Sequence, residues 1–108
     1  MYNKDTKVLL INETFIVDHN NHNEWFDWFK TRYLAAIKDS QHTKDFVLSK
    51  IEDDNPDGKT YALQFKINDI HFDAFQNEEK LIDLRTLFNK KFNNKFASFV
   101  TVLEIVEE

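Results

Sequence analysis

The sequence predicts a two-layer α+β protein in which a four-stranded antiparallel sheet carries helices on one face. Apolar residues alternate with period two over four segments and recur at helical spacing over two others. These segments follow one another as strand, helix, strand, strand, helix, strand. With 108 residues, 42% of them hydrophobic, and no cysteine, the chain is long enough for one core without disulfides. We therefore expect residues 1–108 to form a single domain.

Residues 7–19 predict the first strand. One face of this strand carries Val8, Leu10, Asn12, Thr14 and Ile16. The other face carries Leu9, Ile11, Glu13, Phe15 and Val17. Since both faces present large apolar side chains, the strand is either covered on both sides within the chain or receives half of its cover from another chain.

A helix is predicted over residues 23–38, after a polar stop at residues 18–23 that is rich in helix-capping residues. One helical stripe contains Trp25, Trp28, Phe29, Arg32 and Ala36. Tyr33 and Ile37 lie at the margin of this stripe, and Leu34 lies away from it, which suggests a second contact. We interpret the two tryptophans as core residues rather than as a stacking platform for a ligand, because Phe29 continues their stripe.

Residues 46–51 and 59–67 predict the second and third strands, which form a hairpin. The turn at residues 53–58 contains the only proline and the only glycine of the chain. Residues 68–92 are helical in pattern, but the apolar stripe changes phase. We therefore expect a break near Asn77, which would cap a new helix at residues 78–79. Residues 96–106 predict the last strand.

This order favours a sheet in which the first and third strands are central and both helical regions cover one face. It is the arrangement of the ferredoxin-like βαββαβ fold. The sequence alone does not decide which sheet face the helices cover.

Charge and composition restrict the partners. The net charge is −5 with a pI near 5.3, whereas nucleic-acid-binding domains present a basic face. We therefore expect no nucleic-acid partner. The first residues carry charges of both signs, and no apolar stretch approaches the length of a membrane span. These features predict a cytoplasmic protein with no membrane partner.

Motifs that could carry chemistry are incomplete. Residues 53–58 match the first half of a calcium-binding EF-hand loop, but its twelfth position is the neutral Gln64 instead of a glutamate. His19 and His22 lie in a polar loop without the third ligand that zinc requires. The third strand matches the RNA-recognition signature at Lys59, Tyr61 and Ala62 and fails at most other positions.

Nucleophile and phosphate motifs are also missing. No serine among Ser40, Ser49 and Ser98 lies in the constrained turn of a catalytic nucleophile. A chain with one glycine cannot form a glycine-rich phosphate loop. We therefore assign no catalytic residue, no cofactor and no metal ligand from motifs.

Four blocks carry a resemblance to a known family: residues 11–18 (INETFIVD), 25–30 (WFDWFK), 58–65 (GKTYALQF) and 95–104 (KFASFVTVLE). The chain resembles uncharacterised bacterial proteins of about this length, classed as a domain of unknown function of the DUF4286 type. The family often has a proline where this chain reads Leu34-Ala35-Ala36, and a basic residue where Val100 stands. The resemblance implies a ferredoxin-like α+β fold, with the dimeric α+β barrel as one form of it. It implies no known activity, so no catalytic residue is transferred.

Two functional hypotheses follow. The first is a non-enzymatic module that forms a homodimer through the sheet face that the helices leave open. Apolar residues remain on either choice of face: Ile11, Phe15, Phe99 and Leu103, or Leu10, Ile16, Val100 and Val102.

The second hypothesis is a small-molecule-binding protein or dimeric-barrel enzyme of the monooxygenase-like or isomerase-like type, with a pocket between helices and sheet. Its candidate polar lining is Asn12, Thr14, Arg32, Tyr61, Gln64 and Thr101. Whether the protein is an enzyme stays open at this point.

Overall fold

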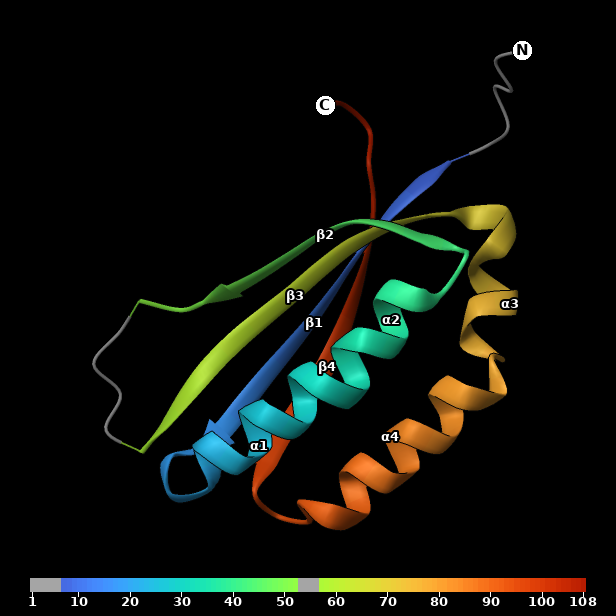
Figure 1. Cartoon of the computed structure of the whole chain (residues 1–108). Coiled ribbons are helices and arrows are strands. Elements are labelled where there is room, and N and C mark those ends of the chain that lie inside the picture. The colour runs from blue at the N-terminus through green and yellow to red at the C-terminus, as the bar shows by residue number, and fades with distance from the viewer. Residues whose placement is uncertain (1–6, 53–56) are drawn as a thin grey trace.

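The computed structural model describes residues 7–52 and 57–108, and Figure 1 shows its helices gathered on one face of the sheet. The strands are β1 (Val8–Asp18), β2 (Thr43–Lys50), β3 (Gly58–Asn68) and β4 (Phe96–Glu104). They pair antiparallel in the order β2-β3-β1-β4. The expected fold is thus confirmed, with the first and third strands central. Most of the turn expected at residues 53–58 lies outside the described residues.

The first helical region is one continuous run with a change of pitch inside it. It consists of the 3-10 turn η1 (His19–Asn21), α1 (His22–Trp28), the π-helical segment η2 (Phe29–Leu34) and α2 (Ala35–Asp39). A π turn holds more residues than an α turn, so it rotates the residues that follow it. Tyr33 and Leu34 are therefore buried, whereas Arg32 is exposed, contrary to the stripe expected from a regular α-helix.

The second helical region is broken, as expected. It consists of the 3-10 turn η3 (Asp69–His71), α3 (Phe72–Gln76) and α4 (Glu79–Lys91). The capping prediction for Asn77 was wrong, because this residue ends α3 and its side-chain amide donates a hydrogen bond of 2.8 Å to the carbonyl of Asp73. Glu78 is the residue that precedes α4. The break lets Phe75 and Leu81 both reach the core.

The core lies between the helices and the odd-numbered face of β1. Aromatic rings dominate it, and Phe15 of β1 contacts five of them: Trp25, Phe29, Tyr33, Phe88 and Phe96. Aromatic side chains bury more area per residue than any others. The core therefore joins β1 to the first helical region, α4 and β4 through one ring.

The strand register corrects how the apolar residues were grouped. Thr14 lies opposite Phe99, and Leu10 lies opposite Leu103. Residues opposite each other in an antiparallel pair share a face. Phe99 and Leu103 therefore lie with Leu10 and Ile16 on the open face, not with Ile11 and Phe15 as one expected grouping had it.

Candidate functional site

Glu13 is the one charged residue among those described whose side chain is buried, with 5% of its surface exposed. It lies in the middle of β1, between Leu63 of β3 and Val100 of β4. Its odd-numbered position points the carboxyl group toward the helices, because successive side chains of a strand alternate between faces. A buried carboxyl group needs hydrogen-bond partners.

Tyr33 of η2 supplies a hydrogen bond to Glu13. Its hydroxyl group donates to Oε1 of Glu13 at 2.6 Å. The tyrosine is itself buried, and it reaches the core because the π-helical segment rotates it inward. A π turn in the middle of a helix is often found at functional sites.

Arg85 of α4 completes the cluster. Its Nε donates a hydrogen bond of 3.2 Å to the hydroxyl oxygen of Tyr33. Its guanidinium group lies 5.9 Å from the ring centres of Tyr33 and Phe75. Two hydrogen bonds that share the Tyr33 hydroxyl group therefore link Arg85 of α4 to Glu13 of the sheet.

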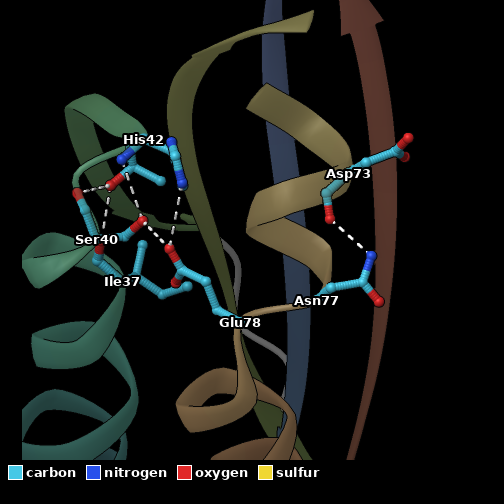
Figure 2. Close-up of polar contacts among 7 residues, drawn as sticks. Ile37, Ser40, His42, Asp73, Asn77 and Glu78 are labelled. Carbon is cyan, nitrogen blue, oxygen red and sulfur yellow. Dashed lines mark hydrogen bonds and ion pairs between the residues drawn. The ribbon is translucent and has the colours of Figure 1, made fainter. Parts of the chain in front are cut away.

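Contacts at the start of α4 hold this helix in place. Figure 2 shows Glu78, just before α4, receiving a hydrogen bond of 2.8 Å from the Ser40 hydroxyl group at the end of α2. The Nε2 atom of His42 lies 3.9 Å from the same Glu78 oxygen. Ser40 thus joins the two helical regions, and we find it in this structural contact rather than in a nucleophile turn.

Burial changes the pKa values of Glu13 and Tyr33. Burial raises the pKa of Glu13, although its hydrogen bond from Tyr33 and the charge of Arg85 act in the opposite direction. Burial also raises the pKa of Tyr33, and the neighbouring Glu13 carboxyl group adds to this shift. Tyr33 therefore keeps its proton and remains a hydrogen-bond donor, while Glu13 is protonated more readily than an exposed glutamate.

A groove opens over this cluster, between β4 and the helices α3 and α4. It has two lobes, with volumes of about 140 Å³ and about 420 Å³, which share Glu13, Arg85 and Val100 in their walls. The smaller lobe includes the rings of Phe15, Phe88 and Phe96. The larger lobe includes Ile11, Phe72, Phe75 and Val102. We call this space the Glu13 groove.

The groove exists because the helices do not cover the edge strand. Val100 and Val102 point to the helix side of β4, since they pair with Glu13 and Ile11, yet both are exposed. Val100, where the resembled family often has a basic residue, is uncharged here. Glu13 and Arg85 are the charged residues in the walls of the two lobes, among the residues that the structure describes.

The opposite face of the sheet forms a second candidate site. Its middle consists of Leu10, Asn12, Thr14 and Ile16 of β1, Thr60, Ala62 and Gln64 of β3, Ala97, Phe99, Thr101 and Leu103 of β4, and Val47 and Ser49 of β2. We call this set the open face. This middle part contains no charged residue, although 31% of the chain is charged; Lys66, opposite Leu10, and Lys44, opposite Lys66, lie on the same face at its end. Charges begin at one end of it, where Lys66 pairs with Asp45 and Glu108.

The structure divides the candidate pocket residues between two faces of the sheet. Four of them, Asn12, Thr14, Gln64 and Thr101, lie on the open face. Tyr61 lies on the helix side of β3, where its hydroxyl oxygen is 2.5 Å from Nε2 of His22. Arg32 is exposed on the helix surface, beside Lys80 and Asp39.

Glu13, Tyr33 and Arg85 were not among the candidate site residues. One signal in the sequence pointed to Glu13, since it is an acidic residue between Ile11 and Phe15 on an otherwise apolar strand face. No comparable signal marks Arg85, whose role depends on where α4 packs. Across the described ranges, 7–52 and 57–108, no three histidine, aspartate or glutamate side chains gather as a metal site.

These features define a class: a ferredoxin-like α+β protein whose sheet has an uncharged open face on one side and a groove with a buried carboxyl group on the other. The chain belongs to the family described as domain of unknown function DUF4286, which matches residues 8–106. No match is found among curated proteins. No helix in the described part of the chain is long and apolar enough to cross a membrane.

Several solved structures share the fold. A dimeric ferredoxin-like protein from an uncultured marine organism has a TM-score of 0.68 and 11% identity, covering 96% of this chain and 99% of that one. The hydroxynitrile lyase of Passiflora edulis has a TM-score of 0.67 and 16% identity, and the match covers 93% of this chain and 95% of that one. SnoaB, a cofactor-independent oxygenase of Streptomyces nogalater, has a TM-score of 0.66 and 13% identity, and the match covers 94% of this chain and 95% of that one. At these identities the likeness concerns the fold alone.

Proposed function

We propose that this protein is a self-associating module that forms a homodimer by pairing the open faces of two sheets. The observation that carries the proposal is the uncharged, partly apolar open face. Phe99, Leu103, Ile16 and Val47 are each more than 40% exposed on it. Large exposed apolar patches on small proteins mark interaction surfaces.

A second copy of this chain suits the open face better than a charged partner would. The chain carries a net charge of −5, so two copies repel each other unless they meet through an uncharged surface. Strands of this length, spaced ~4.8 Å apart with a rise of ~3.3 Å per residue, give the whole sheet face, including its charged end, a projected area of roughly 600 Å². This is close to the ~800 Å² that each partner contributes to a standard interface.

One neighbouring structure supports self-association. It is described as a dimeric ferredoxin-like protein. In a two-fold dimer each residue of the open face meets its symmetry-related surface, so one apolar patch covers the other. The cytoplasmic location expected from the sequence stays a prediction.

The homodimer predicts a mass in solution of twice 13.0 kDa. Phe99→Glu should convert it to a monomer at micromolar concentration, because the two-fold axis places two new carboxylates in one apolar interface. Leu87→Glu is the matched control, since Leu87 is 54% exposed on α4 and Phe99 is 53% exposed on β4. Light scattering should report a dimer for the control. A monomeric wild-type protein, or equal behaviour of both variants, would contradict the proposal.

A second candidate function is the binding of a small molecule in the Glu13 groove. The specific observation in its favour is a buried, hydrogen-bonded carboxyl group and an arginine in the wall of an otherwise mostly apolar groove. Ligand sites combine apolar walls with a few polar groups in this way. Structural neighbours include proteins described as a hydroxynitrile lyase and as a cofactor-independent oxygenase.

Groove binding predicts that one-ring aromatic fragments shift the amide NMR signals of Arg85 and Val102, two residues of the groove wall, in a saturable way. Val100→Trp should abolish these shifts by filling the space that both lobes share. Val106→Trp adds the same ring beyond the end of β4, at a residue 88% exposed, and should leave the shifts unchanged. The absence of saturable shifts at millimolar fragment concentrations would remove this function.

A further inference from the structure

We infer that the Glu13 groove binds a small organic anion, with an aromatic or aliphatic body against the apolar side chains of the two lobes and its anionic oxygen on the guanidinium group of Arg85. This inference rests on groove binding as proposed above and adds the charge and the size of the ligand.

Arg85 has hydrogen-bonding capacity to spare. A guanidinium group has five N–H donors arranged in a fork that fits a carboxylate group. One of them, on Nε, is used by Tyr33. Among the described residues, no hydrogen bond or ion pair involves its two terminal nitrogens. A partly buried cation that lines both lobes and retains free donors is a docking point for an anion.

The volume of the groove fits a ligand with one aromatic ring or an aliphatic group of similar size. An apolar cavity of ~150 Å³ is large enough to hold a benzene ring. The smaller lobe, with about 140 Å³, matches that size, and its walls combine the rings of Phe15, Phe88 and Phe96 with the polar side chains of Asn89 and Ser98. The larger lobe leaves room for a substituent beside Phe72 and Phe75. Since Arg85 lies in the walls of both lobes, either lobe can hold the body while the anionic group reaches it.

The protonation state of Glu13 determines whether the groove carries a net positive charge that attracts an anion. An ionised Glu13 balances Arg85 and repels a second carboxylate, whereas a protonated Glu13 leaves the charge of Arg85 available. Burial already raises the pKa of Glu13, and a bound anion beside it raises this pKa further. An anion should therefore bind together with a proton, and Tyr33 still donates its hydrogen bond to the neutral acid.

Few charged or titratable groups face Glu13, so few residues can affect the coupling between anion binding and protonation of Glu13. The first helical region contributes Tyr33, and α4 contributes Arg85. The neighbouring strands place Leu63 and Val100 opposite Glu13. The residues that α3 contributes to the same lobe, Phe72, Phe75 and Gln76, carry no charge. Glu78 acts on Arg85 and not directly on Glu13.

Isothermal titration calorimetry with benzoate and its neutral isostere benzamide tests the inference on the full chain. Benzoate should bind at least tenfold more tightly than benzamide. Its affinity should fall as the pH rises through the raised pKa of Glu13, because Glu13 then loses its proton in the free protein. The heat of binding should depend on the ionisation enthalpy of the buffer, which reports uptake of a proton.

Four variants separate the parts of the inference. Arg85→Gln should lose the preference for benzoate, whereas Arg85→Lys should keep part of it. Glu13→Gln should keep the preference and lose the pH dependence. Lys90→Gln removes an exposed charge from the last turn of α4 and should change neither. Circular dichroism verifies that each variant is folded.

The outcomes are distinguishable. If benzamide binds as well as benzoate and Val100→Trp blocks both, the groove binds small molecules but the anion assignment is overturned. If benzoate binds with unchanged affinity to Arg85→Gln, the anion lies elsewhere and the inference also fails. If neither compound binds to the wild-type protein, both groove binding and the anion assignment are overturned for ligands of this size.

Discussion

Phe15→Ala is expected to remove a large part of the free energy of unfolding. The ring of Phe15 is 2% exposed and lies 5.0 Å from the ring centre of Phe29 and 5.6 Å from that of Trp25. Phenylalanine to alanine changes in protein cores cost ~3–5 kcal/mol, through lost burial and the cavity left behind. Domains of this size have ~5–15 kcal/mol in total. Urea denaturation followed by circular dichroism at fixed protein concentration measures the loss.

Two controls accompany this prediction. Phe15→Leu retains part of the apolar volume and should cost clearly less than Phe15→Ala. Phe26→Ala removes a ring that is only partly buried at the edge of the same cluster, and its cost should also be smaller. If Phe15→Ala cost no more than Phe26→Ala, Phe15 would not be the residue that joins β1 to the helices and β4.

Gly58→Ala should destabilise the end of the β1–β3 pair. A Cβ atom at this position would lie 2.4 Å from the carbonyl oxygen of Val17 and 3.3 Å from its carbonyl carbon. Both are backbone atoms, so the strands themselves must separate. Forcing an extra carbon into a packed site costs ~1–3 kcal/mol. We expect a loss of this size in urea denaturation.

The loss should also be local. The amide of His19 donates a hydrogen bond of 3.2 Å to the carbonyl of Asp57, next to Gly58, and its hydrogen exchange should accelerate in Gly58→Ala. Thr60→Ala, two residues further along β3, serves as the control because it shortens a side chain on the open face without moving the backbone. Equal exchange rates at His19 in wild type and Gly58→Ala would show that the close approach does not matter.

The fold followed from patterns that depend on local sequence. Period-two and helical spacing located every strand and helical region, and the handedness of crossovers then left one favoured sheet order. The errors came from contacts that no local pattern contains. Asn77 ends α3 instead of capping α4, and the π-helical segment turned Tyr33 and Leu34 inward in place of Arg32.

The candidate site was less accessible to sequence reasoning. Asn12, Thr14, Gln64 and Thr101 share one face, but the alternation of each strand could not say whether that face meets the helices. The groove lies on the other face and depends on how far α3 and α4 extend over β4. Arg85 and Glu13 are 72 positions apart in the chain, and only the packing of α4 brings them to the same hydroxyl group.

The sequence by itself determined the α+β class, the order of the elements, the central place of the first and third strands and the excess of apolar side chains on the sheet. The tertiary structure decided which face the helices cover, and with it the division between an uncharged open face and a groove over Glu13. The physical reason is that hydrophobic alternation is a property of one strand, whereas a strand register and a buried polar contact exist only between segments.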